Sequence, residues 1–244
     1  MMLLLKVVLA GVFMLYVARQ CRRPSSVLGR VLARSMNASH DKLTRWGLSH
    51  VDIEPHFTML DVGCGGGRTI ETLLSLAPAG RVFGVDYSPA SVAVARDRNR
   101  TAIENGRVQI GEGSVSSLPF GDDTFDLVTA VETHYYWPDL PADVREVKRV
   151  VKTGGAFVII AETYRGRSHD WLYRPVMQFL LRAAYLTPDQ HRLLLADAGF
   201  HDIEVCEEKA KGWICATGHK STIDATQESG SKAAPLDRTD LHRA

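Results

Sequence analysis

Three glycines at alternate positions, preceded by an acidic residue, are the first feature of the sequence that points to ligand chemistry. The pattern is Asp61-x-Gly63-x-Gly65-x-Gly67, and it follows a short apolar run. Because glycine lacks a Cβ atom, such a turn can adopt positive φ angles and let a ligand contact bare backbone amides. The order of apolar run, glycines and polar residues predicts a buried strand, a tight turn and a helix that begins near Arg68.

A second acidic residue, Asp86, ends the next apolar run, at residues 81–86. In a doubly wound sheet the carboxyl ends of neighbouring parallel strands meet at one edge, and an acid there can accept hydrogen bonds from both ribose hydroxyls. Nicotinamide enzymes also carry an acid at this place, but their fingerprint needs a glycine where this chain has Arg68. Asp86 therefore predicts an adenosine-containing ligand but does not decide which cofactor it is. The alternative is that Asp86 is an ordinary aspartate in a surface turn.

The glycine pattern resembles motif I of the class I methyltransferases that use S-adenosylmethionine, and three further motifs follow in the family's order. Residues 111–120 are similar to the adenine-binding loop, 125–128 to the Phe-Asp-Leu-Val entry of the fourth strand, and 151–155 to the Leu-Lys-Pro-Gly-Gly turn. The resemblance covers about residues 37–219 and is to the small-molecule type. It implies an α/β fold, a Rossmann-like doubly wound seven-stranded sheet that is mostly parallel with an antiparallel last strand and has helices on both faces.

The resemblance also implies S-adenosyl-L-methionine as the cofactor, and no metal. The residues expected to contact the cofactor are Asp61, Gly63, Cys64, Gly65, Gly67, Asp86, Tyr87, Ser114, Val115 and Glu132. Ser114 stands where the family usually has Asp, and its hydroxyl can still accept from the adenine amino group, but without charge. An N-terminal helix and the segment after the fourth strand often shape the acceptor pocket in this family. That pocket is expected to include His40, Trp46, Tyr135, Tyr136 and Tyr164.

Methyl transfer from a sulfonium is an in-line displacement, so the protein mainly supplies positioning and a water-poor pocket. An oxygen or nitrogen acceptor would also need its proton removed. The ionisable residues expected nearest the methyl group are Glu132, His134 and Glu162. We take Glu132 and His134 as the catalytic candidates. The alternatives are that Glu132 holds the cofactor or a lid side chain, and that His134 is a packed histidine.

Composition limits the other functions. The chain has 244 residues and a formal net charge of +1, which suits one α/β domain with extensions and gives no strong field to attract nucleic acid. Its four cysteines are scattered without paired zinc spacing, which indicates a reducing compartment and no metal site. We therefore expect a small-molecule acceptor and no nucleic-acid partner.

The N-terminal segment differs from the rest of the chain. Residues 1–20 are mostly apolar and clustered arginines follow them, a pattern typical of a single membrane anchor whose following domain stays cytoplasmic. As a helix, residues 3–18 would be about 24 Å long, short of a hydrocarbon thickness of about 30 Å. A cleaved signal peptide, a helix packed on the protein and an overextended start are the alternatives. The predicted location is the cytoplasmic face of a membrane, or the cytoplasm.

These features must be positioned by four regions: an apolar segment at 1–20, a helical lid at 21–50, a methyltransferase domain at 51–219 and a disordered tail at 220–244. Within the domain, helices are expected at 69–76, 88–105, 144–150, 171–184 and 187–198, and strands at 59–62, 81–86, 107–110, before Glu132, and at 156–161, 203–207 and 213–217.

The apolar N-terminus favours a lipophilic methyl acceptor at a membrane surface. Two other functions stay open on the sequence alone. One is an NAD(P)-dependent oxidoreductase with a variant glycine turn, and the other is a non-catalytic, membrane-tethered protein that binds the cofactor without using it.

Overall fold

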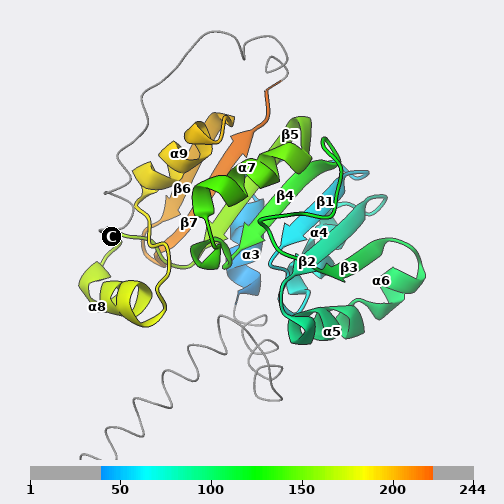
Figure 1. Ribbon diagram of the computed structural model, residues 1–244, viewed down its shortest axis with the longest axis horizontal. Helices are drawn as coiled ribbons and strands as arrows, with labels where there is room; N and C mark the ends of the chain where they lie inside the picture. Colours follow the sequence, from blue (N-terminus) through cyan, green and yellow to red (C-terminus); the bar gives the residue numbers. More distant parts are fainter. Residues whose placement is uncertain (1–39, 222–244) are drawn as a thin grey trace, which may run out of the picture.

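The computed structural model describes residues 40–221, which fold into a seven-stranded sheet with helices on both faces (Figure 1). The strand order is β3-β2-β1-β4-β5-β7-β6. Strands β1 to β5 are parallel to their neighbours among themselves, and β7 runs antiparallel to both β5 and β6. The strand order reverses between β1 and β4, where such folds bind ligands. The predicted doubly wound sheet with an antiparallel last strand is confirmed.

The strands are β1 (Thr58–Val62), β2 (Arg81–Asp86), β3 (Val108–Glu112), β4 (Phe125–Val131), β5 (Val151–Ala161), β6 (His201–Glu208) and β7 (Trp213–His219). The α-helices are α3 (Asp41–Leu48), α4 (Arg68–Leu76), α5 (Pro89–Arg98), α6 (Arg100–Glu104), α7 (Leu140–Val150), α8 (Asp170–Pro175) and α9 (Pro188–Asp197). A 3₁₀ helix, η1 (His134–Tyr136), follows β4, and a π-helix, η2 (Val176–Leu180), follows α8.

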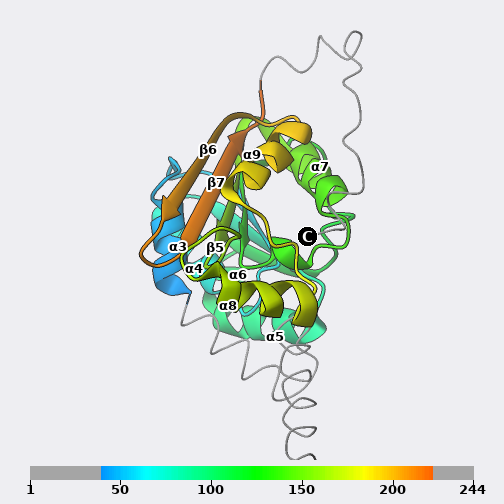
Figure 2. The ribbon, with the colours of Figure 1, turned by 90° about the vertical axis from the view of Figure 1, so that its left-hand side faces the viewer.

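Two apolar clusters hold the helices against opposite faces of the sheet. Leu43 of α3 and Ile70 and Leu73 of α4 belong to one cluster. Val147 of α7 and Leu195 of α9 belong to the other. Figure 2 shows α3 and α4 on one side of the strands and α7 and α9 on the other. Because helices cover both faces, the central strands are nearly continuous apolar runs.

The predicted helix at 88–105 was wrong in one respect, because it is interrupted at Asn99 between α5 and α6. The buried amide of Asn99 donates hydrogen bonds to the carbonyl oxygens of Gly67 (3.1 Å) and Ala95 (2.9 Å). Asparagine side chains compete with the helix for backbone partners, so a break at such a residue is expected. The break ties α5 to the glycine turn after β1.

Two other helix boundaries also differ from the prediction. The helix expected at 171–184 is shorter, since α8 ends at Pro175 and continues only as the π-helix η2. Proline lacks an N–H and its ring clashes with the preceding turn, so the α-helical hydrogen bonds cannot continue through it. Helix α7 begins earlier than expected because the Asp139 carboxylate caps it, accepting a hydrogen bond from the Ala142 N–H over 3.2 Å.

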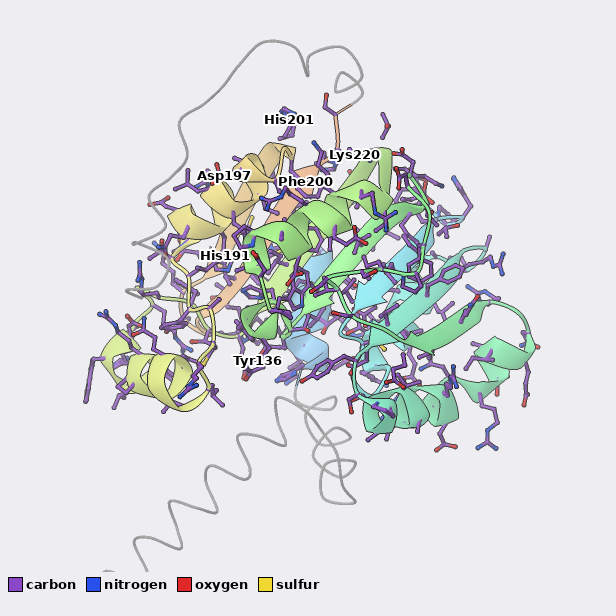
Figure 3. The ribbon with its side chains drawn as sticks, in the orientation of Figure 1. Tyr136, His191, Asp197, Phe200, His201 and Lys220 are labelled. Atoms are coloured by element: carbon purple, nitrogen blue, oxygen red, sulfur yellow. The ribbon has the colours of Figure 1, made fainter. Side chains whose placement is uncertain are left out.

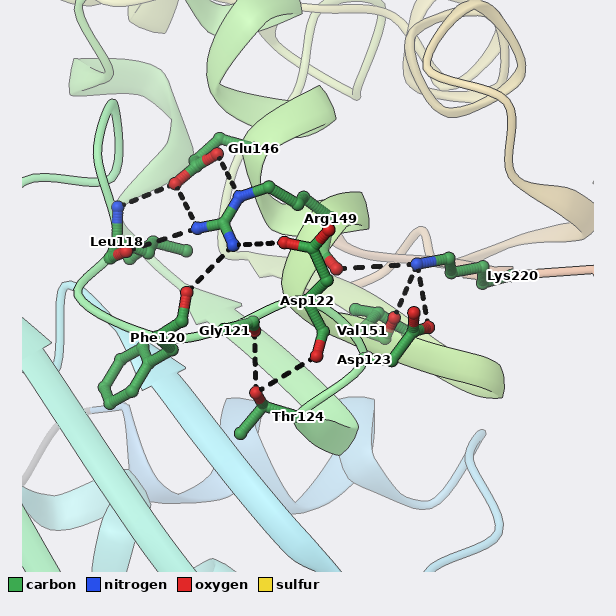
Figure 4. A network of polar contacts seen from close by, with 10 residues as sticks. All are labelled: Leu118, Phe120, Gly121, Asp122, Asp123, Thr124, Glu146, Arg149, Val151 and Lys220. Atoms are coloured by element: carbon green, nitrogen blue, oxygen red, sulfur yellow. Dashed lines mark hydrogen bonds and ion pairs between the residues drawn. The ribbon is translucent and has the colours of Figure 1, made fainter. Parts of the chain in front are cut away.

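Residues 1–39 and 222–244 lie outside the described residues, and with them the predicted apolar segment, most of the predicted lid and most of the predicted tail. Lys220, at the start of that tail, pairs with Asp123 over 3.0 Å and donates to the Val151 carbonyl over 2.9 Å (Figure 4). Between residues 40 and 221, no helix combines the length and the apolar character that crossing a bilayer requires.

Candidate active site

The glycine turn joins β1 to α4 and has the predicted backbone conformation. Gly63, Gly65 and Gly67 have φ angles of 72°, 52° and 79°, in the left-handed region that favours glycine. The Gly63 N–H donates to the Val85 carbonyl over 2.7 Å, which ties the turn to the end of β2. A Cβ atom on Gly63 would collide with the side chain of Thr133. The turn therefore requires glycine for its conformation and, at Gly63, for space.

Asp86 lies at the end of β2, directly opposite this turn. Its Oδ2 accepts the Gly65 N–H over 2.9 Å and its Oδ1 accepts the Ser88 N–H over 2.8 Å. Burial raises the pKa of the Asp86 carboxyl above its ordinary value, although both hydrogen bonds oppose the shift. Each carboxylate oxygen has about two acceptor positions. One position on each oxygen is thus left for the two hydroxyls of a ribose.

Asp61 and Gly67 contact neighbouring buried residues around the glycine turn. The Asp61 carboxylate is buried and accepts a hydrogen bond from the Thr129 hydroxyl over 2.8 Å, and burial raises its pKa to about 7. Gly67 is the N-cap residue of α4 and packs against Ala95 and Asn99. These contacts shape the turn, and direct contact of Asp61 and Gly67 with the cofactor stays a prediction.

A cavity of about 460 Å³ lies between the turn, Asp86 and the end of β4. Among its lining residues are ten of those predicted for the cofactor or the acceptor: His40, Gly63, Cys64, Gly65, Asp86, Tyr87, Ser114, Val115, Glu132 and Tyr136. Tyr136, labelled in Figure 3, lies in η1 just after β4 and lines the cavity. Residues far apart in the sequence thus meet at the predicted edge.

The loop after β3 brings Ser114 and Val115 to the cavity and is held from behind by Arg149 on α7. The Arg149 guanidinium donates to both Glu146 oxygens, to Asp122, and to the carbonyls of Leu118 and Phe120, at 2.7–3.2 Å (Figure 4). These two carboxylates raise the pKa of Arg149. The planar, fork-shaped donor group fixes several points of the loop at once.

His40, the residue directly before helix α3, lines the cavity. The Arg68 guanidinium, at the start of α4, donates to the Asp41 carboxylate over 3.1 Å and so joins the two helices. Gly47 lets α3 approach β5 closely, since a Cβ there would meet the Ile160 side chain at 2.5 Å. His40, which directly precedes α3, is in this way fixed against the end of β5.

Three ionisable side chains meet at this point: His40, Glu132 and Glu162. The Nε2 atom of His40 lies 3.6 Å from Oε2 of Glu162. The Oε1 atom of Glu132 accepts a hydrogen bond from the Tyr135 hydroxyl over 2.6 Å and one from the Glu162 N–H. Glu132 has a φ of 58°, unusual for a residue other than glycine, which turns the chain sharply after β4. Both His40 and Glu132 line the cavity.

The charges of this cluster depend on one another. Burial lowers the pKa of His40, but the carboxylates of Glu162 and Glu132 outweigh that effect and raise the pKa above its ordinary value. The hydrogen bond with His40 lowers the pKa of Glu162. Burial, together with the charge of Glu162, raises the pKa of Glu132. Each of the two groups thus favours the charged form of the other.

His134, predicted as a catalytic residue, is not among the residues that line the cavity. It is buried, and its Nε2 lies 3.3 Å from Nε2 of His191 on α9. The Nδ1 of His191 lies 2.8 Å from the Thr187 carbonyl and must donate to it, so the neutral ring can only accept at Nε2. His134 is then the donor of the pair, and its own Nδ1 has no partner within the described chain. The packed-histidine alternative fits this position.

The predicted aromatic wall is divided between the cavity and its support. Tyr136 lines the cavity. Tyr135 and Tyr164 are buried beneath α8 and η2, in a cluster that includes Met177. Trp46 packs on Trp213, with ring centroids 5.7 Å apart. The structure thus places Trp46, Tyr135 and Tyr164 in a supporting layer rather than on the cavity surface.

Comparison with known proteins fits this geometry. Residues 60–159 match the family model described as a methyltransferase domain. Methyltransferase GfsG of Streptomyces halstedii is 32% identical over 130 residues, which cover 53% of this chain and 46% of the relative. Residues 60–159 are thus a methyltransferase domain. The matched segment contains the turn, Asp86 and the end of β4.

Two further methyltransferases extend the comparison. The chloroplastic 2-methyl-6-phytyl-1,4-hydroquinone methyltransferase of Arabidopsis thaliana is 30% identical over 199 residues, covering 81% of this chain and 54% of that protein. The crystal structure of a SAM-dependent methyltransferase from Aquifex aeolicus has the same fold, with a TM-score of 0.62, 20% identity, and coverage of 78% of this chain and 97% of that one. The chain spans about half the length of the curated relatives it matches.

Several residues of this site were not predicted from the sequence. Thr44, Arg68, Thr69 and Ser91 line the cavity, yet each lies in a helix whose pattern shows only packing. Their one signal is position, since Arg68 and Thr69 begin the helix after the glycine turn. His40, Glu132 and Glu162 also offer three ligand atoms within 4.8 Å of one another, a combination that can bind cations. The absence of a metal stays a prediction.

Proposed function

We propose that this chain transfers a methyl group from S-adenosylmethionine to a small-molecule acceptor. The observation that carries the proposal is the meeting of the glycine turn and Asp86 across one cavity, with Asp86 holding the Gly65 amide. Bound S-adenosylmethionine supplies the chemistry, a methyl group activated by a sulfonium. The free acceptor positions of Asp86 suit a ribose, and Ser114 and Val115 in the adjoining loop suit an adenine ring.

The proton of the acceptor is the second task of the site. Glu132 and His40 are the ionisable side chains that share the cavity surface near the end of β4, and Glu162 orients His40. We assign the removal of this proton to the His40–Glu162 pair with Glu132 beside it, in place of the buried His134. A hydroxyl or amine hydrogen-bonded to a neutral imidazole would lose its proton as the acceptor is methylated.

The acceptor is proposed to be lipophilic. Tyr136, Trp137 and Pro138 give the cavity an aromatic and apolar wall next to Glu132. The Arabidopsis relative is named for a phytyl hydroquinone, which supports a lipophilic acceptor for this chain. A long apolar acceptor would also account for the apolar character of residues 1–20, for which we propose a membrane-anchoring role on the cytoplasmic side.

The direct test is incubation of the full chain with methyl-labelled S-adenosylmethionine and fractionated cell extract, followed by separation of lipids from polar metabolites. Label in the lipid fraction supports the proposal in full. Label only in polar metabolites would keep methyl transfer and reject the lipophilic acceptor. Tight cofactor binding without any labelled product would reject the enzyme. Deletion of residues 1–20 tests the anchor separately, because it should weaken membrane association and leave methyl transfer intact.

A further inference from the structure

A group of apolar side chains stands exposed on α8 and η2, away from the cavity. Trp171, Leu172, Tyr173 and Val176 have exposed fractions of 71%, 53%, 42% and 43%. We call these four residues the α8 patch. They make up four of the seven large hydrophobic side chains that are exposed between residues 40 and 221. In Figure 1, α8 stands apart from the sheet at the lower left. A concentration of this kind marks an interaction surface.

The α8 patch belongs to a well-anchored element. Met177 and Tyr185 are buried beneath it. The Tyr185 hydroxyl donates to the Asp170 carboxylate over 2.6 Å, at the start of α8. The Arg167 guanidinium lies over the Tyr173 ring, 4.3 Å from its centroid. One face of the segment is therefore packed, and the opposite face carries the exposed apolar groups as a fixed feature of the fold.

The segment that carries the patch has an excess of positive charge. Residues 165–182 contain four arginines and one aspartate, a formal net charge of +3, whereas the whole chain has +1. The aspartate, Asp170, is already engaged by Tyr185. Arg174 lies in α8 itself and is exposed, as is Arg182 just after η2. The segment therefore combines exposed apolar and aromatic groups with a local excess of cations.

We propose that the α8 patch binds the surface of an anionic lipid bilayer. Tryptophan and tyrosine side chains favour the interface between headgroups and acyl chains, and neighbouring arginines are attracted to anionic headgroups. A second copy of the chain fits less well, because it would bring the same excess positive charge against this one. Four exposed side chains are also far fewer than the roughly 20–30 residues a side of a stable protein interface.

The patch is connected to the cavity through the core beneath it. Met177 packs in the same buried cluster as Tyr135. The Tyr135 hydroxyl donates to Glu132, which lines the cavity. Buried contacts therefore join the α8 patch to the end of the cavity at Glu132. The inference that a lipophilic acceptor enters from a bilayer bound at the patch rests on the proposed function, whereas bilayer binding by the patch does not.

The test uses tryptophan fluorescence of the full chain with vesicles of phosphatidylcholine and phosphatidylglycerol in a ratio of about 7:3, with and without dibrominated phosphatidylcholine. Bromine quenches only tryptophans that enter the acyl region. Quenching is expected in the wild type and should fall at least severalfold in Trp171→Phe. Leu172→Ser should reduce it, while Leu193→Ser, an equally exposed leucine on α9 (54%), should leave it unchanged. Vesicles without phosphatidylglycerol should quench less.

Three results would overturn the proposal: no binding to these vesicles, binding without quenching, or equal quenching in the wild type and Trp171→Phe. Binding without quenching would leave residues 1–20 as the membrane contact, or a protein as the partner of the patch. Calorimetry of S-adenosylhomocysteine with the same protein samples reports on the cofactor site separately. The failure of the lipid surface and the failure of the proposed enzyme can therefore be told apart.

Discussion

The imidazole of His40 and the carboxylate of Glu162 face each other, with Nε2 and Oε2 3.6 Å apart. His40 precedes α3, near the beginning of the described chain, and Glu162 directly follows β5. His40 and Glu132 line the cavity that includes the glycine turn, and Glu162 contacts both of them. Because these residues are far apart in the sequence, only folding brings them together as a candidate proton acceptor.

The first prediction concerns the ionisation of this pair. Glu162→Gln removes the negative charge that favours protonated His40, so the pKa of His40 should fall, as burial is then less opposed. Proton NMR of the imidazole gives the titration directly and needs no acceptor. Glu104→Gln, on the exposed helix α6, is the control and should leave the His40 titration unchanged. An identical titration in Glu162→Gln would contradict the pairing.

The second prediction concerns stability at acid pH. Burial lowers the pKa of His191 to about 4, below the ordinary histidine value of 6.5, so the unfolded chain binds the proton first as the pH falls. Stability should therefore be lost between about pH 6.5 and pH 4, by about 3 kcal/mol from this group. Urea unfolding at several pH values measures it. His191→Gln should unfold with a weaker pH dependence in this range, and an equal dependence would contradict the assignment.

The third prediction compares two glycines with nearly the same backbone. Gly63 and Gly106 have φ angles of 72° and 71°, but an added Cβ meets Thr133 at Gly63 and open space at Gly106. Gly106→Ala should cost about 1 kcal/mol from backbone strain alone. Gly63→Ala should cost about 3 kcal/mol or more and should also weaken cofactor binding. Urea unfolding and calorimetry measure both effects. Equal losses in the two variants would show that space at Gly63 is unimportant.

The fourth prediction concerns the support of the loop after β3. Arg149→Lys keeps the charge but replaces a planar five-donor group by a single ammonium, so the carbonyls of Leu118 and Phe120 lose partners. The free energy of unfolding should fall by about 1–2 kcal/mol. Arg145→Lys, on the exposed side of the same helix, is the matched control and should have little effect. A stability loss of the same size in both variants would reject the network's role.

Local patterns were enough to predict much of the fold and half of the site. The glycine turn and Asp86 were found because strand, turn and acid follow one another within a short stretch, and the cap of α9 by Thr187 is likewise local. Contacts between distant segments were not found. Nothing near His40 in the sequence indicates Glu162, and nothing near His134 indicates that His191 would bury it. The helix breaks at Asn99 and Pro175 were also missed. Each depends on a single residue within a sequence pattern that otherwise favours a helix.

The most direct measurement of the central claim is the affinity for S-adenosylhomocysteine of the Asp86→Ala variant, by calorimetry. Loss of the carboxylate removes the acceptors for the ribose and releases the Gly65 amide, so the affinity should fall at least about tenfold, or about 1.4 kcal/mol. Asp52→Ala, at an exposed position, should bind as the wild type does. If Asp86→Ala remains folded by circular dichroism and binds with unchanged affinity, the proposed cofactor site is contradicted.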